Sequence, residues 1–284
     1  MTYSYENRTV NLSQVYQKIA LGESILSCFP DDSAEQLKDA NDVAIMEVAD
    51  RDSIAAGMKA IKEGLVTEIL PVADIIPPES GNINKAFSQI FWLKHEAKEY
   101  NVKIHDIIFI EHVDLYNVLT ARYSEELITK YGFYSPCLTC HLYFHTSRAP
   151  LVRALGGKKI IGGERNSHDG KIKMSQIPLA LNYYKKAISE LGAELILPIR
   201  DIKDTKDIIS LSYNDNTQLS CMFKQMYGNL PPRITQNKTL LRNFFEGFAV
   251  PLSVSIIKEL TTNPAADLIG FSDAFMQNLV NESQ

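Results

Sequence analysis

The chain has 284 residues, 45% of them hydrophobic, which is enough for one large core or for one core with a small additional segment. Its formal charge of −5 offers no strong attraction for polyanions, so tRNA is not favoured as a partner, although a local patch could still bind it. Four cysteines are too few for a secreted disulfide framework, the first residues lack a signal pattern, and no apolar run approaches the roughly 20 residues that cross a bilayer. We expect a cytoplasmic protein with reduced thiols and no membrane partner.

The first predicted segment, residues 1–40, is helical. Leu12, Val15, Tyr16 and Ile19 recur at the spacing of one helix face, which indicates a helix that packs on or covers the rest of the protein.

Strands and helices alternate in the next predicted unit, residues 41–228. Strands are expected at 43–48, 67–72, 104–110, 158–161 and 194–197, with helices at 52–63, 84–100, 115–130, 141–155 and 175–191. This order predicts an α/β fold, with a doubly wound, mostly parallel five-stranded sheet and ligands at the carboxyl ends of its strands. Residues 229–284 are expected to form a helical appendage, whose aromatic residues could cover the sheet domain or form the contact of a homodimer.

The end of the first strand in this unit carries a polar run, Asp50, Arg51, Asp52 and Ser53, directly before a helix. A loop at a helix N-terminus presents N–H groups and positive potential to an anion, so these four residues are candidates for binding a phosphate. Capping of the helix by Asp52 or Ser53 is the alternative.

A second polar run follows the strand at 158–161. Gly162 and Gly163 precede Arg165, which can grip a phosphate or carboxylate, His168, which can exchange protons near neutral pH, and Asp169, which can orient either or bind a magnesium-bridged phosphate. The alternative is a solvated turn without a catalytic role.

The cysteines Cys137 and Cys140 form a C-x-x-C pair whose spacing suits zinc, redox and iron–sulfur roles alike. Placement at a helix N-terminus would lower the pKa of a thiol, and Cys221 could complete a soft-ligand site. Zinc could be bound by these three thiols with His141 or His145, although two histidines four residues apart are also typical of a partly buried helix face.

The polar run at 50–53 and its neighbours resemble the PP-loop ATP pyrophosphatases, the adenine nucleotide alpha-hydrolase superfamily, whose first strand ends in S-G-G-x-D-S. Residues 51–53 match the x-D-S half, whereas residues 48–50, Val-Ala-Asp, replace the S-G-G half and put a carboxylate where phosphate is expected. The resemblance implies a HUP-like sheet.

The cysteine order is similar to that of the PP-loop enzymes that thiolate tRNA. In those relatives three cysteines hold a [4Fe-4S] cluster with one open iron, so the resemblance implies Cys137, Cys140 and Cys221 as ligands and leaves out Cys28. The segment that contains Lys206 resembles the strand-to-helix segment of 7-cyano-7-deazaguanine synthases.

The resemblance therefore implies an iron–sulfur-dependent enzyme that transfers sulfur to or from a small molecule or nucleobase. It would thiolate its substrate with ATP, magnesium and a sulfur donor, or remove sulfur if the altered loop no longer holds ATP. Asp52 and Ser53 would lie near the phosphates and Arg165 would stabilise the charge that develops on pyrophosphate. A non-catalytic regulator that binds a nucleotide or zinc, and an ATP-dependent amidating ligase like the deazaguanine synthase, are the alternatives.

Overall fold

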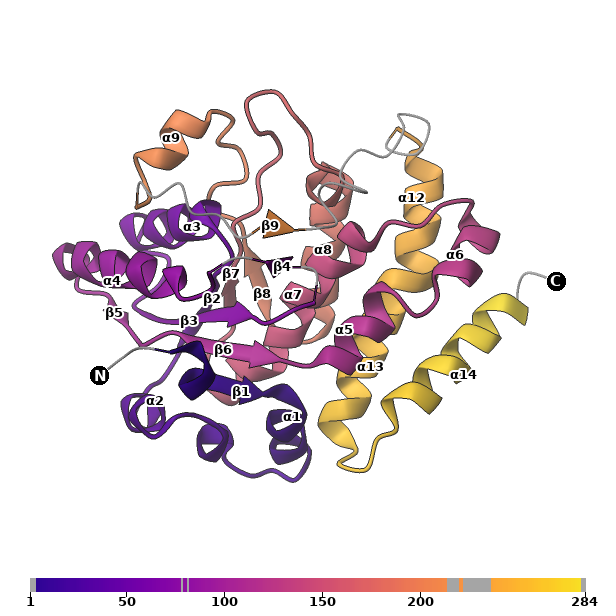
Figure 1. The fold of residues 1–284 in the computed structure, drawn as a ribbon, viewed down its shortest axis with the longest axis horizontal. Coiled ribbons are helices and arrows are strands. Elements are labelled where there is room, and N and C mark those ends of the chain that lie inside the picture. Colours follow the sequence, from indigo (N-terminus) through magenta and orange to yellow (C-terminus); the bar gives the residue numbers. More distant parts are fainter. Residues whose placement is uncertain (1–3, 78, 81, 214–219, 222–235, 282–284) are drawn as a thin grey trace.

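The computed structural model describes residues 4–77, 79–80, 82–213, 220–221 and 236–281. A seven-stranded sheet, in which every neighbouring pair is parallel, lies between two layers of helices (Figure 1). The fold class is therefore α/β with a parallel sheet, as the alternation of elements predicted.

The direction in which successive strands are added to the sheet reverses in the middle of the sheet. The strands are β1 (Thr9–Asn11), β2 (Ala44–Glu47), β3 (Glu68–Asp74), β5 (Lys103–Ile104), β6 (Ile108–Glu111), β7 (Lys159–Ile161) and β8 (Glu194–Ile196), in the order β1-β6-β3-β2-β7-β8, with β5 beside β3. The chain builds from β2 through β3 to β6 and then continues on the other side of β2 with β7 and β8. Ligands bind at such a switch point in doubly wound sheets, here between β2 and β7.

The helices cover both faces of this sheet. Along the chain they are η1 (Tyr5–Arg8), α1 (Leu12–Ala20), η2 (Ile25–Cys28), α2 (Asp31–Leu37), α3 (Arg51–Lys62), α4 (Lys85–Ala97), η3 (Lys98–Tyr100), α5 (Val113–Thr120), α6 (Ser124–Tyr131), α7 (Pro136–Ala154), η4 (Met174–Gln176), α8 (Pro178–Glu190), α9 (Thr205–Ile209), α12 (Lys238–Phe244), η5 (Phe245–Ala249), α13 (Val250–Thr262) and α14 (Leu268–Asn281). A separate antiparallel pair joins β4 (Glu79–Ser80) to β9 (Ser220–Cys221).

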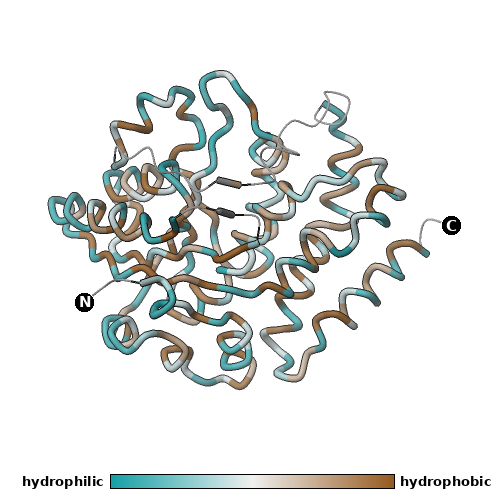
Figure 2. Tube along the Cα trace, in the orientation of Figure 1, coloured by the Kyte–Doolittle hydropathy of each residue, from teal (hydrophilic) through white to brown (hydrophobic). Residues whose placement is uncertain are grey.

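Both faces of β2 are buried, as expected of a central parallel strand. Ile45 faces Leu70 and Ile160 across the ladder and lies in the hydrophobic cluster that includes α1, α7, α8 and α13. Its neighbour Met46 points to the opposite face, into the cluster under α3 and α4. Figure 2 shows that hydrophobic positions concentrate along the strands and on the helix sides that face them.

The prediction of five strands was wrong. The N-terminal segment, expected to be helical throughout, also contributes β1 to the sheet, and the strand expected at 104–110 is divided into β5 and β6. Strands of two or three residues are too short to show a period of two in the sequence, so only pairing with neighbours reveals them.

The helix expected at 115–130 is two helices, α5 and α6. The chain turns between them where Arg122 and Tyr123 both bind the carboxylate of Asp273 on α14, at 2.8 to 3.0 Å. The residues at this break contact a segment about 150 residues away in the sequence. A local sequence pattern therefore does not predict the break between the two helices.

The aromatic residues near the C-terminus lie inside the protein. Phe244, Phe245 and Phe248 are at most 1% exposed, and α13 packs in the same cluster as α7 and α8. These three rings therefore cover the α/β unit, which is the packing role that the sequence suggested.

One helical run bears on the expectation that no apolar segment spans a membrane. Within the described part of the chain, residues 238–262 form 25 helical residues that are long and apolar enough by length and composition. Of its most apolar window, 61% is buried inside the structure, which is typical of the core helix of a soluble protein.

Candidate functional site

Buried polar residues gather at the carboxyl ends of the central strands. Glu47 ends β2, Asp74 ends β3, and Glu164 and Arg165 follow β7. These four residues are at most 7% exposed. They surround the switch point of the sheet, where the fold class predicts a ligand.

The centre of this cluster is His145 on α7, which is fully buried between two carboxylates. Its Nδ1 lies 2.5 Å from Glu47 Oε1, and its Nε2 lies 3.6 Å from Glu164 Oε1. A Cβ atom on Gly162 would lie 3.3 Å from the Glu47 carboxylate and 3.4 Å from the imidazole, so the glycine lets the backbone after β7 approach this pair. Gly162 therefore has a packing role in the structure, beside the ligand-binding role that the sequence predicted for it.

A buried arginine extends the cluster toward β3. Arg148, one turn after His145 on α7, is 1% exposed, donates to the carboxylate of Asp74 and to the carbonyl of Val72, and lies 3.9 Å from Glu47. Burial raises the pKa of Asp74 to about 6, although the Arg148 charge acts in the opposite direction.

A second arm of the cluster, which is a chain of hydrogen bonds, connects Glu164 to the start of α3. Arginine can only donate, so the 2.7 Å contact between Arg165 and His168 Nδ1 makes that nitrogen an acceptor and leaves the proton on Nε2. This Nε2 donates to Gln176, whose amide donates to Glu164, while Arg165 Nε donates to Asp52 at 3.1 Å. Arg165 therefore donates toward both ends of this chain of bonds, to Asp52 on one side and, through His168 and Gln176, toward Glu164 on the other.

The carboxyl groups at the two ends of this arm differ in acidity. Burial and the nearby Asp50 raise the pKa of Asp52 to about 6. Burial alone would also raise the pKa of Glu164, but the charge of His141 and its hydrogen bond lower it to about 2. Burial and Lys173 lower the pKa of His168 to about 4, so the imidazole is neutral at neutral pH.

The pair His141 and Glu164 has the arrangement of an oriented base. His141 Nδ1 lies 2.6 Å from Glu164 Oε1, and the imidazole is 26% exposed while the carboxylate is 6% exposed. A buried carboxylate on one ring nitrogen fixes the tautomer and leaves Nε2 for proton transfer. This pair is the part of the cluster that a ligand could reach.

The N-terminus of α3 is closed by the chain itself. Asp50 is the N-cap and its carboxylate accepts the Asp52 N–H at 2.9 Å, while the Ser53 hydroxyl accepts the Ala49 N–H at 3.2 Å. The backbone of Gly163 packs on the same turn, where a Cβ atom would lie 2.7 Å from the Ser53 nitrogen. The amides that were expected to bind phosphate already have these neighbours.

The remaining candidates lie apart from the buried cluster. Asp169 is exposed, has a φ of 52°, and binds the backbone and hydroxyl of Thr205 at 2.7 and 2.5 Å, which makes it part of a turn. Lys206 is exposed in the first turn of α9. Arg51 opens α3, and its buried Nε has no hydrogen-bond partner among the described residues.

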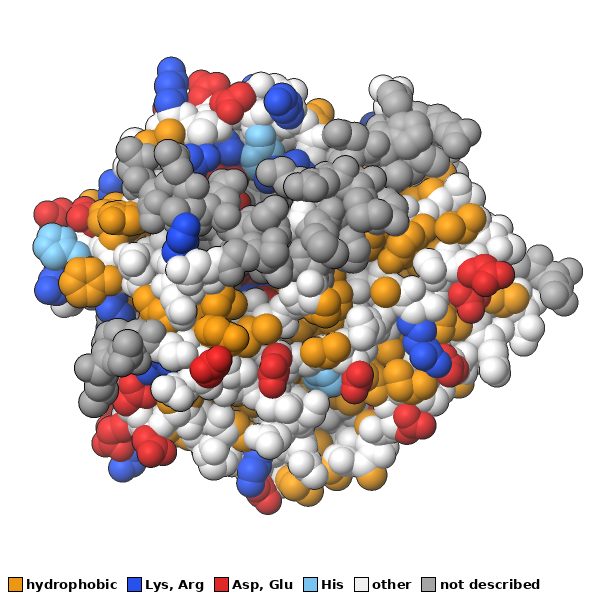
Figure 3. Space-filling view, in the orientation of Figure 1, with side chains coloured by type: hydrophobic (Ala, Val, Ile, Leu, Met, Phe, Trp, Pro, Cys, Tyr) orange, Lys and Arg blue, Asp and Glu red, His pale blue; other side chains and the backbone are white. Residues whose placement is uncertain are grey.

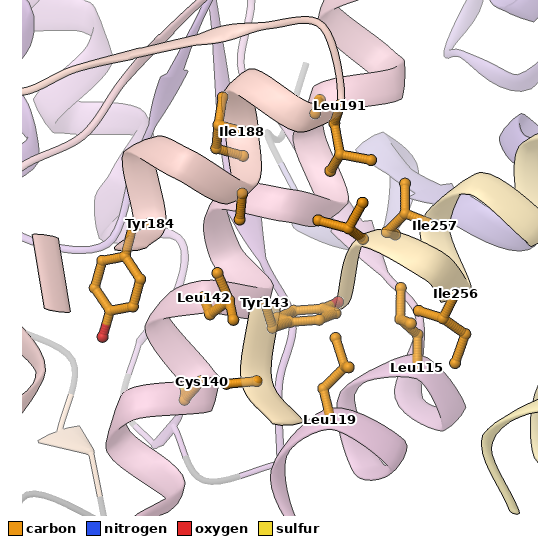
Figure 4. Packing of buried hydrophobic residues seen from close by; sticks show 14 of the residues in the cluster. Leu115, Leu119, Cys140, Leu142, Tyr143, Tyr184, Ile188, Leu191, Ile256 and Ile257 are labelled. Atoms are coloured by element: carbon orange, nitrogen blue, oxygen red, sulfur yellow. The ribbon is translucent and has the colours of Figure 1, made fainter. Parts of the chain in front are cut away.

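The cysteine pair lies inside the first turns of α7. Cys140 is 4% exposed and belongs to the hydrophobic cluster; Figure 4 shows it on α7 with Leu142 and Tyr143, beside Leu119 of α5. Burial raises the pKa of Cys137 to about 12, and the charge of Cys221 adds to this effect. The expected lowering of the thiol pKa by the helix terminus was therefore wrong, because desolvation outweighs it.

The three cysteines have the donor chemistry of a soft-metal site but not its geometry. Cys221 on β9 is close enough for its charge to act on Cys137 and on Tyr116, the tyrosine whose hydroxyl lies 3.7 Å from Cys140 Sγ. Across residues 4–281 with the gaps noted above, no group of three His, Cys, Asp or Glu side chains is arranged to hold a metal ion. As described, the three thiols do not form a ready-made site for a cluster or a zinc ion.

Sequence reasoning missed most of the buried cluster: Glu47, Asp74, Arg148, Glu164 and Gln176. One signal was present, since a glutamate and an aspartate at the ends of apolar strands are unusual in a buried position unless they are paired. His141, His145 and Arg148 also share one side of α7 at spacings of four and three residues, but that face became a site only once Glu164 was placed against it.

The chain has a relative of similar length. No family model and no solved structure matches it. The uncharacterized protein MJ0009 of Methanocaldococcus jannaschii is 36% identical over 229 residues, which cover 77% of this chain and 80% of the relative. The chain therefore belongs to the same protein family as MJ0009.

Proposed function

We propose that this protein is a cytoplasmic enzyme that removes sulfur from a small thiocarbonyl compound, such as a thiolated nucleobase, by hydrolysis without ATP. The observation that carries the proposal is that two features lie together at the N-terminal end of α7. One is the oriented base, His141 with Glu164, and the other is the thiol of Cys137 with that of Cys221, which comes from a distant part of the chain. Cys137 lies one turn before His141 on α7, and the charge of Cys221 acts on it from β9. A thiol that stays protonated can donate a weak S–H hydrogen bond to the sulfur of a substrate.

The closed N-terminus of α3 supports the reaction without ATP. Asp50 supplies an anion at this terminus, and Gly163 packs against the Ser53 amide. A phosphate would have to displace both. ATP-dependent thiolation and the amidating ligase reaction need that phosphate site, so they are less well supported than desulfuration, although the order of the central strands is the one that nucleotide-binding doubly wound sheets use.

In the proposed reaction His141 Nε2 takes a proton from water as the water oxygen attacks the thiocarbonyl carbon. The new C–O bond forms, the electrons of the C=S bond move to sulfur, and protonated His141 gives its proton to this sulfur. His141 then takes the remaining hydroxyl proton as the C=O bond forms and the C–S bond breaks, and passes that proton to the departing hydrosulfide. Water and the thiocarbonyl thus become a carbonyl and hydrogen sulfide, with no net oxidation. Glu164 keeps the Nδ1 proton of His141 in place and stabilises the imidazolium during the transfer.

The metal site that the resemblance implies is a separate part of the proposal. A [4Fe-4S] cluster, or zinc, would bind Cys137, Cys140 and Cys221 after a rearrangement of these thiols, because the described side chains do not form a ready-made site. Iron and zinc analysis of anaerobically purified protein, compared with Cys221→Ala and with Cys28→Ala as the control, tests this part alone. Iron that is lost in the first variant and kept in the second supports the cluster, and a colourless protein with one zinc favours the regulator.

The decisive experiment measures sulfide released from 2-thiouracil and 4-thiouracil, anaerobically, with and without ATP. We expect release that ATP does not change, and a loss of at least about 100-fold in His141→Asn, the usual contribution of a general base. His95→Asn is the matched control, since His95 is 73% exposed on α4. Release of pyrophosphate that is coupled to turnover would contradict the proposal and favour the ATP-dependent reactions. Activity that His141→Asn leaves intact would remove the base from the mechanism.

A further inference from the structure

His145 is a buried histidine that the proposed reaction does not use. Figure 3 shows that other histidine side chains reach the surface, where water can hydrate them, whereas His145 is fully buried. Its Nδ1 lies 2.5 Å from Glu47 Oε1 on one side, and its Nε2 lies 3.6 Å from Glu164 Oε1 on the other. Both nitrogens of this ring therefore face a carboxylate oxygen.

A neutral imidazole does not suit this position. It has one N–H donor and one nitrogen that can only accept, and an ionised carboxylate can only accept as well. Glu47 also lies 3.9 Å from the guanidinium of Arg148, the contact of an ionised carboxylate, so the proton of its short contact with His145 belongs to Nδ1. In a neutral ring the lone pair of Nε2 would then face Glu164, and this repulsion is strong where the dielectric constant is low.

The neighbours of His145 offer Nε2 no other partner. Within the described part of the chain, this nitrogen has no hydrogen bond. Tyr184 packs on the imidazole with ring centroids 5.2 Å apart, but its hydroxyl donates to the carbonyl of Leu138 at 3.0 Å. A Cβ atom on Gly162 would lie 3.4 Å from the imidazole, so the backbone after β7 closes another side. The interaction that remains for Nε2 is charge attraction to Glu164.

The charges of the cluster also require a further cation. Three buried carboxylates, those of Glu47, Asp74 and Glu164, lie around the buried guanidinium of Arg148, which donates to Asp74. One positive charge compensates one of them, and buried charges without compensation are costly. A protonated His145 would lie between the two carboxylates to which Arg148 does not donate.

We propose that His145 is a buried imidazolium that binds Glu47 and Glu164 from between them and thereby positions Glu164 for His141. The attraction holds Glu164 Oε1 at the place where it lies 2.6 Å from His141 Nδ1. His145 is a positioning residue, because it acts on the reaction through Glu164. Its effect on His141 as a base rests on the proposed desulfuration, whereas its charge and its contact with Glu164 do not.

The charge is tested by nitrogen-15 nuclear magnetic resonance of the histidine side chains in the full wild-type chain at neutral pH, with each ring assigned by through-bond correlations. We expect both nitrogens of His145 to be protonated. His112 is the internal reference, because its Nδ1 accepts the Leu115 N–H at 3.3 Å and burial lowers its pKa to about 4, so one of its nitrogens should be unprotonated. A His145 ring with one unprotonated nitrogen overturns the proposal.

The positioning role is tested by His145→Gln, which replaces the cation by a neutral amide. His112→Gln is the matched control, since His112 is a second buried histidine, at the N-cap of α5. The Nδ1 proton of His141 that faces Glu164 should give a low-field proton signal in wild type and in the control, and this signal should be lost in His145→Gln. For sulfide release from 2-thiouracil, kcat should fall at least about 10-fold in His145→Gln, with KM changed less than about twofold.

The outcomes separate this role from the proposed function. A low-field signal that His145→Gln keeps overturns the positioning role, and so does a kcat equal to that of His112→Gln. A wild-type protein that releases no sulfide contradicts the desulfuration alone, and the resonance measurements still decide the charge of His145 and its effect on Glu164. Far-ultraviolet circular dichroism establishes that the variants fold, and the wild-type spectrum tests the charge without them.

Discussion

The ion pair of Arg148 and Asp74 offers the sharpest test of how the buried cluster is held together. Both side chains are 2% exposed, and the arginine also donates to two backbone carbonyls, one of them Val72 O at 3.1 Å. Replacing Arg148 by Met keeps most of its apolar volume and removes the charge. The change leaves the Asp74 carboxylate buried without its cation.

We expect Arg148→Met to lower the free energy of unfolding by about 3 to 5 kcal/mol, the cost of leaving a buried charge unpaired. This is a large part of the 5 to 15 kcal/mol that stabilises a typical domain. The double variant Arg148→Met with Asp74→Asn carries no unpaired charge, so it should recover about 1 to 3 kcal/mol of that loss.

The loss should also depend on pH. Burial raises the pKa of Asp74 from 3.8 to about 6, so the folded state binds this proton more tightly than the unfolded state does. Stability is therefore higher at low pH, and it falls as pH rises through the folded pKa. The charge of Arg148 lowers the pKa of Asp74, so removing Arg148 raises that pKa further. The single variant should therefore be less destabilised at about pH 5 than at about pH 8.

Urea unfolding followed by circular dichroism measures all three proteins at both pH values. The reasoning is refuted if Arg148→Met loses less than about 1 kcal/mol, or if the double variant is as unstable as the single one at the higher pH. A double variant that still shows the pH dependence would assign it to a group other than Asp74.

Three further perturbations test other contacts. Gly163→Ala places a Cβ atom 2.7 Å from the backbone of α3 and should cost several times the roughly 1 kcal/mol expected for Gly170→Ala, whose positive φ is strained but whose surroundings are open; urea midpoints compare the two. Glu164→Gln should remove stability that is present above the unfolded pKa of 4.5 and lost as pH falls toward 2, so its unfolding free energy should vary less over that window than that of wild type, as acid titration would show. Asp50→Ala should cost about 1 kcal/mol as a lost N-cap, and an unchanged melting temperature would contradict its capping role.

The sequence alone determined the class of the fold and which polar residues follow the carboxyl end of a strand. Apolar runs such as the one around Ile45, separated by helical periodicity, require a parallel sheet with both faces covered, and the polar residues after Gly162 follow a strand at its carboxyl end. These are local patterns. They depend only on which neighbours in the chain are apolar and on the spacing between them.

Only the tertiary structure decided which polar residues form the site. His145 lies between Glu47 and Glu164, groups from β2 and from the loop after β7, and none of their positions in the chain indicates that they meet. Conversely, Asp169 looked catalytic beside His168 and instead closes a turn. The sequence shows which type of side chain stands at each position, whereas tertiary packing decides which other side chain it contacts.

The same distinction applies to ionisation. The cysteine pair is visible in the sequence, and a helix terminus suggests a low thiol pKa, yet burial raises the pKa of Cys137 to about 12. Likewise, His141 and His145 are identical residues one turn apart, but one is partly exposed and the other fully buried. Desolvation and pairing depend on the whole surroundings of a group, and these exist only when the chain has folded.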